Sequence, residues 1–418
     1  MFPTPTFAPT RAALYTPPPM TMTRLRLLTA GESHGPSLTG ILEGMPAGLR
    51  LDEATIARDL ARRQRGFGKG GRMALEQDRA RITAGVMNGC TTGGPIALVI
   101  DNRDHANWAD KDVPPMTAPR PGHADLTGAV KFGHRDLRLA LERASARETA
   151  MRVALGACCR ALLGEFGITV GGYVTAIGDV ALDLGEPSPD AAVYEERFAA
   201  AEANDVRCPD AATAARMHDA IAATIAARDT LGGVVEAAVL HAPPGLGNFA
   251  QLDRKLDSRI AAAVMGLPAV KGCELGLGFR GTKHRGTQAH DAIATDGDEL
   301  TRPTNRAGGL EGGISNGLPI VVRAALKPIA TTLTPQQTVD LATGASAPTK
   351  YERSDFCQVP RAVPIVEAAL AIALCDALLE KLGGDSLEEI HPRLFALRQM
   401  RLSHLPMDGA PWRFGYGS

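Results

Sequence analysis

Residues 362–384, AVPIVEAALAIALCDALLEKLGG, form a nearly all-apolar segment that ends in two glycines. Its length and composition predict a helix. Because a helix that is apolar on every side cannot face water, we expect this one to be buried. The two glycines supply its stop signal. The segment therefore predicts a helix inside the hydrophobic core of the chain.

Further helices are predicted where apolar positions recur every three to four residues. In residues 51–66, Asp52 can cap the helix and Gly66 can end it. A long helix, rich in alanine and glycine on its packing side, is predicted at 141–167. The other predicted helices are 209–228 and 249–266. Short apolar runs predict strands at 24–30, on both sides of a turn in 81–102, and at 232–240.

The two halves of the chain contain similar turn sequences in the same order. EGMPAGL and GVMNG occur in the first half, and HAPPGLG and GISNG occur in the second. Chance similarity of turn residues is the alternative explanation. Since no low-complexity linker separates the halves, we expect one pseudo-symmetric domain, at residues 23–390. A Pro/Thr-rich extension at 1–22, expected to be disordered, precedes it, and a tail at 391–418 without a clear period follows it.

The composition excludes several classes of protein. The 45 basic and 46 acidic residues give a net charge of −1, which argues against a general nucleic-acid binder. The seven cysteines are odd in number and form no C-x-x-C pattern. This usage indicates a reduced, cytoplasmic chain without a disulfide framework or a zinc site. We find no apolar run of about 18 residues and therefore expect no membrane span.

The sequence GESHG at 31–35 matches G-x-S-x-G, the pattern of a hydrolase nucleophile elbow. An elbow needs a helix after its serine, and the Pro and Gly residues that follow prevent one here. The match also comes too early in the chain for a sheet to precede it. We therefore reject the elbow. Ser33 and His34 then lie on a tight turn after a strand, where the imidazole can face either a cleft or solvent.

Two segments combine cations with turn or cap residues. In residues 119–138, Arg120 and His123 enclose a Pro-Gly pair that cannot be helical. In residues 142–150, Ser145 stands near a helix start with an arginine two residues away on either side. Helix amides together with guanidinium groups make an anion site. A solvated basic loop and an ordinary helix cap are the alternative interpretations.

Two more segments of this kind lie in the second half. Glycine pairs at 306–317 allow a close approach of backbone to a ligand, and Lys327 follows with two threonines. Arg353 and Asp355 stand two residues apart in an extended segment, where they can also be a structural ion pair. The glycines at 66–71 fit G-x-G-x-x-G, but a helix precedes them where a strand is required, so we reject a dinucleotide site. Together the four segments predict a ligand with several negative charges.

Three long stretches resemble a known family. Residues 31–48, 141–157 and 353–369 resemble the three signatures of chorismate synthase. The segments RPGHAD, LPAVKG, NRAGGLEGGISNG and LKPIAT are also similar to that family. The resemblance extends from about Met22 to Glu389, and the signatures occur in the expected order.

This resemblance implies an α+β fold, a β-α-β sandwich with an internal pseudo-twofold repeat, assembled as a homotetramer. It implies an anti-1,4-elimination of phosphate from 5-enolpyruvylshikimate 3-phosphate to give chorismate, the last common step of the shikimate pathway to aromatic amino acids. Reduced FMN is required although the reaction has no net redox change. NADPH would act only indirectly, as a source of reducing equivalents. We expect an external flavin reductase, because no added reductase domain is visible in the sequence.

The resemblance also assigns site residues by motif. The implied catalytic residues are His34, His123, Asp355, Ser33 and Ser145. The implied FMN contacts are Arg143, Ala144, Ser145, Pro268, Ala269, Gly312, Lys327, Pro328, Ile329, Ala330, Thr331 and Arg353. The implied contacts to substrate or NADP are Arg63, Lys69, Arg120 and Arg147, and no metal is implied. Lys69 departs from the family, which commonly has arginine there. Two other functions stay open, an FMN enzyme with net hydride transfer and a non-catalytic homologue that binds a phosphorylated metabolite.

Overall fold

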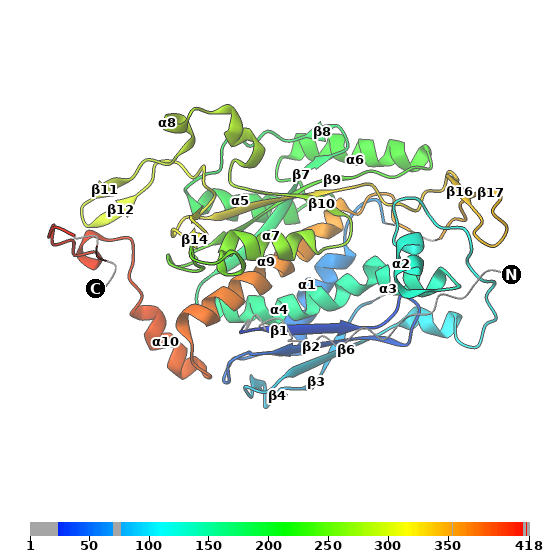
Figure 1. Ribbon diagram of the computed structural model, residues 1–418, viewed down its shortest axis with the longest axis horizontal. Coiled ribbons are helices and arrows are strands. Elements are labelled where there is room, and N and C mark those ends of the chain that lie inside the picture. Colours follow the sequence, from blue (N-terminus) through cyan, green and yellow to red (C-terminus); the bar gives the residue numbers. More distant parts are fainter. Residues whose placement is uncertain (1–23, 70–76, 353, 413–414, 416–418) are drawn as a thin grey trace.

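The computed structural model describes residues 24–69, 77–352, 354–412 and 415. Its central feature is a layer of helices between two antiparallel sheets (Figure 1). The four-stranded sheet has the order β1-β2-β6-β3, and the five-stranded sheet has the order β10-β15-β9-β7-β8. The mixed helix and sheet content agrees with the α+β expectation.

The predicted strands are confirmed, and the structure adds others. The four-stranded sheet contains β1 Arg26–Ala30, β2 Ser37–Glu43, β3 Ala80–Ala84 and β6 Ile96–Asp101. The five-stranded sheet contains β7 Thr169–Ile177, β8 Val180–Ala181, β9 Gly233–Leu240, β10 Val270–Leu275 and β15 Ile320–Leu326. Short antiparallel pairs are formed by β4 Val86–Met87 with β5 Cys90–Thr91, β11 Ala294–Asp296 with β12 Glu299–Thr301, β13 Leu310–Glu311 with β14 Ile314–Ser315, and β16 Gln337–Val339 with β17 Ser346–Pro348.

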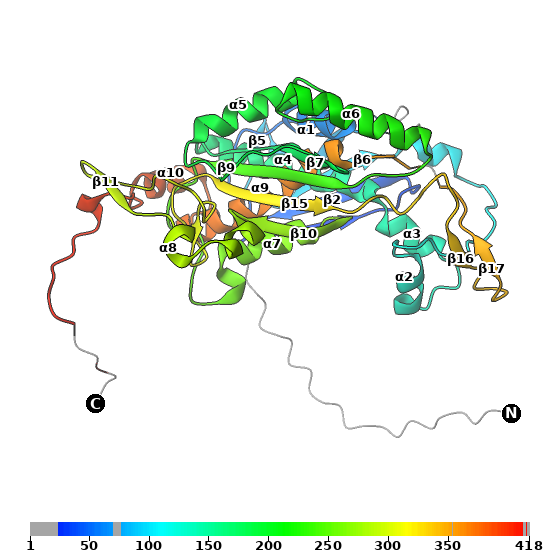
Figure 2. The same cartoon turned by 90° about the horizontal axis from the view of Figure 1, so that it is seen from above.

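The helices fall into an inner and an outer group. The inner group, between the sheets, contains α1 Glu53–Gln64, α4 Thr149–Glu165, α7 Leu256–Met265 and α9 Val359–Leu382. In the outer group, α5 Ala191–Glu202 and α6 Ala211–Ala226 lie along the five-stranded sheet (Figure 2). The remaining α-helices of the described chain are α2 Asp125–Phe132, α3 Arg138–Ala144, α8 Gly286–Ala289 and α10 Leu387–Phe395.

Strand β7 is buried on both faces, because successive side chains point to opposite sides of a sheet. Val170 and Val174 belong to the main core cluster, which includes the inner helices. Tyr173 belongs to a second cluster with Tyr194 and Phe198 of α5. The five-stranded sheet is therefore covered by α9 on one face and by α5 on the other.

Helix α9 is the core helix that the apolar segment predicted. It ends at Gly383, whose positive φ of 62° suits glycine. By length and mean hydropathy, 2.1, it is apolar enough to cross a membrane, so the expectation that the chain lacks an apolar run of about 18 residues is wrong. However, 89% of its apolar window is buried inside the protein, which is typical of a core helix.

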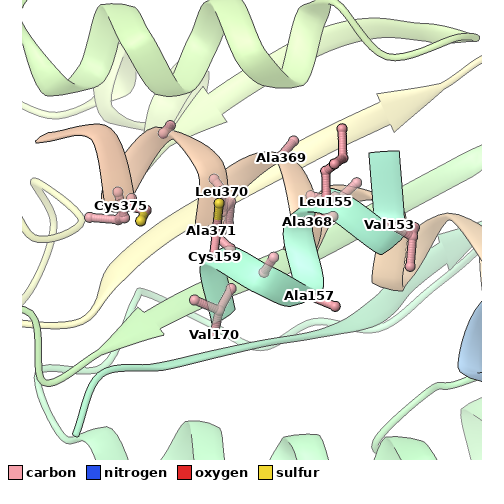
Figure 3. Packing of buried hydrophobic residues seen from close by; sticks show 14 of the residues in the cluster. Val153, Leu155, Ala157, Cys159, Val170, Ala368, Ala369, Leu370, Ala371 and Cys375 are labelled. Atoms are coloured by element: carbon pink, nitrogen blue, oxygen red, sulfur yellow. The ribbon is translucent and has the colours of Figure 1, made fainter. Parts of the chain in front are cut away.

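Helices α4 and α9 pack closely through small side chains (Figure 3). A Cβ atom added at Gly156 would lie 2.4 Å from Ala368 Cβ and 2.7 Å from Ala368 Cα. Such distances are too short for any real side-chain contact. Glycine at this position therefore allows the two helix backbones to meet.

The long helix predicted at 141–167 is wrong in one respect, because it is broken at Ser145. Helix α3 ends at Ala144, Ser145 has an extended ψ of 143°, and a 3₁₀ turn at Ala146–Glu148 leads into α4. The Ser145 side chain accepts the Arg147 N–H at 3.3 Å. A serine that bonds its neighbouring backbone competes with the helix, and here it ends one helix and starts the next.

Two other predicted boundaries also differ. The helix predicted at 249–266 begins only at Leu256, because the Leu256 N–H donates to the Gly313 carbonyl of the β13–β14 turn and Lys255 is extended. The tail predicted from residue 391 is not without structure at its start, since α10 runs to Phe395 and crosses the boundary at 390. Ser386 caps α10 by accepting the Glu389 N–H.

Substitution of Gly156 tests the α4–α9 contact. Gly156→Ala should lower the free energy of unfolding by about 1–3 kcal/mol, because overpacking outweighs the gain of about 1 kcal/mol in helix propensity. Gly164→Ala is the matched control in the same helix, since its added Cβ meets nothing within 4 Å, and it should stabilise by about 0.5–1 kcal/mol. Urea unfolding measures both. Equal stabilisation by the two substitutions would contradict the close approach.

Candidate active site

A cavity of about 550 Å³ opens where loops from both sheets meet the start of α9. Its walls come from the turn after β1, the loop before α2, the break between α3 and α4, the segment after β15, and the residues before α9. All of these are loops or element ends. Segments far apart in the sequence therefore supply one binding space.

Most of the site residues implied by the resemblance line this cavity. They are Ser33, His34, Arg63, Arg120, His123, Ala144, Ser145, Arg147, Pro268, Ala269, Lys327, Pro328, Ile329, Ala330, Thr331 and Asp355. Arg353 lies outside the described residues. The other three are not in the cavity lining.

The three residues outside the lining have different positions. Arg143 is half-exposed and donates to the Thr29 carbonyl at 3.1 Å. Gly312 lies in the turn between β13 and β14, with φ of 61°. Lys69 is exposed in the loop after α1. Their roles in binding stay predictions.

The turn after β1 is held at its backbone. Asn102 Nδ2 donates to the Ser33 carbonyl at 2.7 Å and to the Gly35 carbonyl at 2.9 Å. The Ser33 N–H donates to the Glu142 carbonyl at 3.0 Å. Strand β2 follows this turn, so the nucleophile elbow that we rejected is indeed absent from it. The bonds fix where the imidazole of His34 enters the cavity.

His123 belongs to a buried cluster with Arg120 and Asp125. Its Nδ1 lies 2.6 Å from Asp125 Oδ1 and donates to it, which leaves Nε2 for a ligand. Arg120 Nε donates to Asp125 Oδ2 at 2.8 Å, and Arg120 Nη1 donates to Thr331 Oγ1 at 3.0 Å. Burial alone would raise the pKa of Asp125, but the hydrogen bonds from His123 and Arg120 outweigh it and hold this pKa far below its usual value. The carboxylate thus stays charged and orients both the Arg120 guanidinium and the His123 ring.

A second buried cluster places two arginines at the cavity wall. Arg147 Nη1 donates to Asp78 Oδ1 at 2.6 Å, and Arg63 Nη1 donates to Asp78 Oδ2 at 3.3 Å. Arg63 Nη2 also donates to the Ala146 carbonyl at 3.0 Å, in the break between α3 and α4. Asp78 therefore joins the end of α1 to the start of α4.

At the third wall, Asp355 forms an ion pair with Arg361. Arg361 Nε donates to the Arg63 carbonyl at 3.0 Å, which links α9 to α1. Lys327 Nζ donates to the Gly122 carbonyl. Asp355 therefore pairs with Arg361, six residues further along the chain, whereas the predicted partner Arg353 lies outside the described residues.

Several cavity residues were not assigned from the sequence, namely Trp108, Gly122, Ala124, Leu141, Ala146, Tyr351, Glu352, Ser354, Gln358 and Arg361. Arg361 and Gln358 lie inside a quoted signature, so a signal for them was present. Trp108 follows a short 3₁₀ helix, Arg103–Asn107, in a segment that no motif marked. The acidic partners Asp78, Asp104, Asp125 and Glu142 were missed as well.

The lining is suited to anions. It contains Arg63, Arg120, Arg147, Arg361 and Lys327, against the two carboxylates Glu352 and Asp355. Guanidinium groups bind phosphate and carboxylate in bidentate geometry. Within the described residues, no group of three or more His, Cys, Asp or Glu side chains could hold a metal ion.

Asp125→Asn tests the first cluster. The substitution should lower the free energy of unfolding by about 3–5 kcal/mol at pH 7, because it leaves the buried Arg120 guanidinium without its carboxylate. Since folding lowers the pKa of Asp125, its contribution is present above the usual value of 3.8 and is lost as the pH falls further. The difference between the two proteins should therefore shrink below about pH 4. Urea titrations at several pH values and one protein concentration measure it, and a difference independent of pH would contradict the assignment.

Comparison with known proteins identifies the family of this chain. A sequence profile of the family described as chorismate synthase matches residues 25–379. The chorismate synthase of Syntrophotalea carbinolica is 52% identical over 384 residues, which cover 90% of this chain and 98% of that protein. That of Aquifex aeolicus is 48% identical over 390 residues, covering 90% and 97%. A crystal structure of chorismate synthase superimposes with a TM-score of 0.74 at 43% identity, covering 89% of this chain and 96% of the other. The chain belongs to the chorismate synthase family of lyases.

Proposed function

We propose that the cavity binds 5-enolpyruvylshikimate 3-phosphate together with reduced FMN and converts this substrate to chorismate. The observation that carries the proposal is the convergence of four arginines, one lysine and two histidines on one cavity. The substrate bears a phosphate and two carboxylates, and reduced FMN adds further negative charge. A cavity of this size and charge fits such a pair of ligands.

The cavity lining also fits the flavin itself. Ala144, Ser145, Pro268, Ala269 and the segment 327–331 would hold it, and the half-exposed Arg143 would contact it from the rim. Ala269 has a positive φ of 68°, and its carbonyl accepts the Lys327 N–H at 3.0 Å, so this wall is built from backbone. Gly312 and Arg353 complete the proposed set. When bound, reduced FMN supplies electron density to the substrate and takes it back.

The elimination breaks the ring carbon–oxygen bond to phosphate and one ring carbon–hydrogen bond, and it forms a second ring double bond. The phosphate leaves with the electron pair of the carbon–oxygen bond. His123, as a cation oriented by Asp125, would stabilise the departing phosphate together with Arg120. Arg63 and Arg147 would bind the remaining anionic groups of the substrate, and Lys69 would contribute from the loop after α1.

His34 and Asp355 would handle proton and charge balance. His34 would balance the charge of the reduced cofactor or donate a proton toward it. Asp355 would assist in accepting the ring proton. Ser33 supports the turn that carries His34, and Ser145 places the amides at the start of α4 toward an anion.

We further propose an internal pseudo-twofold repeat. In the first half the order is β2, α1, β3, the β4–β5 hairpin, β6 and α4, and in the second half it is β9, α7, β10, the β13–β14 hairpin, β15 and α9. The corresponding sheet orders are β1-β2-β6-β3 and β7-β9-β15-β10. These parallels support the repeat that the turn sequences suggested.

We also propose that the enzyme is a cytoplasmic homotetramer that depends on an external flavin reductase, with NADPH acting only indirectly. Large apolar side chains are exposed on α2 and α3, including Val130 at 77% and Phe132 at 67%. Contiguous exposed apolar groups are typical of surfaces that bind another chain. They support association between copies.

An anaerobic assay with chemically reduced FMN and substrate tests the reaction. We expect chorismate to form without NADPH and not to form with oxidised FMN alone. Consumption of NADPH in proportion to turnover would instead indicate an oxidoreductase with net hydride transfer. Absence of chorismate with reduced FMN present would indicate a non-catalytic homologue.

His123→Ala and His34→Ala test the two histidines. Each should lower kcat about 100- to 10,000-fold, the usual value of a general acid–base group, because both side chains line the cavity on turns rather than filling the core. Single-turnover stopped-flow kinetics measures the loss, and light scattering checks that assembly is kept. A variant with near-normal turnover would remove that histidine from the mechanism.

A further inference from the structure

The imidazole of His34 lies between two carboxylates from different elements. Glu142 Oε1, on α3, is 2.7 Å from Nδ1, and Glu142 Oε2 accepts the backbone N–H of His34 at 2.8 Å. Asp104 Oδ2, in the 3₁₀ helix Arg103–Asn107, is 4.0 Å from Nε2. One carboxylate thus holds both the ring and the backbone of His34, and a second faces the other ring nitrogen.

Both carboxylates are themselves held in place. The Asp104 side chain is fully buried and accepts from Asn107 Nδ2 at 2.9 Å and from Trp108 Nε1 at 3.2 Å. Glu142 is one turn along α3 from Arg138. Burial alone would raise the pKa of Glu142, but the hydrogen bonds from His34 and the charge of Arg138 outweigh it and keep this pKa below its usual value. Glu142 is therefore a carboxylate at neutral pH.

The remaining neighbours of His34 restrict how its ring can turn. The Trp108 ring centroid lies 4.1 Å from the imidazole centroid, and the two planes are tilted by 40°. Arg138 lies over the same indole, 5.9 Å from its centroid. His105 Nδ1 lies 2.9 Å from the His34 carbonyl and donates to it. Among the described residues, the titratable or charged groups packed around His34 therefore include Glu142, Asp104, Arg138 and His105.

This arrangement has a direct electrostatic consequence. Burial disfavours an imidazolium, whereas the carboxylate of Glu142, hydrogen-bonded to Nδ1, and that of Asp104, 4.0 Å from Nε2, favour it. The hydrogen bond from Nδ1 to Glu142 also fixes the orientation of the His34 ring. Carboxylates commonly orient catalytic and metal-binding histidines in this way. Neither carboxylate lies in the cavity lining, so neither is placed to touch a ligand.

We propose that Glu142 and Asp104 are positioning residues that hold His34 in the cavity as an oriented imidazolium. The inference rests on the proposed function for its catalytic meaning, because only there does His34 serve a reduced cofactor. The positions of His34, Glu142 and Asp104 relative to one another do not depend on the proposed function. A measurement on His34 itself can therefore test the positioning role separately from the proposed function.

Glu142→Gln and Asp104→Asn remove one charge each with little change of shape. The first readout is proton NMR titration of the His34 Hε1 resonance in the protein without ligands, assigned by its absence from His34→Gln. In each variant we expect the titration midpoint to fall by roughly 1–2 pH units relative to the wild type, as on loss of an opposite charge within 4–6 Å. Glu142→Asp keeps the charge and should restore most of the shift.

The second readout is kinetic, with reduced FMN and the substrate. We expect kcat of Glu142→Gln to fall about 10- to 100-fold and its alkaline limb to move to lower pH, while KM for the substrate changes less than threefold. Asp59→Asn is the matched control, because the Asp59 side chain is 14% exposed like that of Glu142 and pairs with Arg160 in another region. The control should keep the wild-type pH profile.

Three outcomes decide the matter. An unchanged His34 titration in both variants overturns the proposal, even if activity falls, because the carboxylates would then be only structural. A lowered midpoint together with the shifted alkaline limb supports it. If the wild type makes no chorismate, the proposed function fails, whereas the His34 titration still confirms or overturns the role of the two carboxylates.

Discussion

The close packing of α4 against α9 is the contact on which the rest of the structure depends. Gly156 and Ala368 let the two helices meet backbone to backbone between the sheets. The contact brings the start of α4 near the start of α9, and α1 packs against both. Arg63, at the end of α1, then donates to the Ala146 carbonyl and accepts from Arg361. The cavity lies at this end because three helix ends meet there.

The break at Ser145 determines which arginine lies where the three helix ends meet. If residues 141–167 formed one continuous helix, Arg143 and Arg147 would lie one turn apart on the same face. The extended backbone of Ser145 separates them instead. Arg143 binds Thr29 outside the cavity lining, whereas Arg147 turns inward to Asp78. A single serine, whose side chain accepts the backbone N–H of Arg147, therefore decides which cation enters the cavity.

The sequence predicted the core helix, the main strands and most of the cavity lining, but not the acidic residues behind it. Apolar periodicity and glycine stops are local signals, so α9 and β9 could be located from them. Lys327 and His123 could be assigned to the site because each occupies a fixed position within a family motif. Asp125 and Glu142 lie inside quoted motifs, so a signal for them was present, whereas Asp78 and Asp104 lie in none. The pairing of all four carboxylates arises only when separate elements pack. For the same reason, the sequence could not show that Gly312 and Lys69 lie outside the cavity lining.

Carboxylates behind or beside the basic residues explain how so many of them can share one cavity. Asp78 stands behind Arg63 and Arg147, Asp125 behind Arg120 and His123, and Asp355 beside Arg361. Each pair offsets the cost of burying a guanidinium and fixes its direction before a ligand arrives. Lys327 differs, because within the described residues it donates to the Gly122 carbonyl and forms no ion pair with a carboxylate.

The same pairing sets a limit on how strongly the cavity attracts anions. An arginine with a carboxylate behind it presents a smaller net charge to the cavity than an arginine alone. Its value to a ligand is therefore mainly directional, through N–H groups held in a fixed fork. The charge that draws anions would then come mostly from cations that have no carboxylate beside them among the described residues, and in the proposed site Lys327 would have that role. Binding of a multiply anionic substrate would combine both effects, since Lys327 attracts it and the arginines orient it.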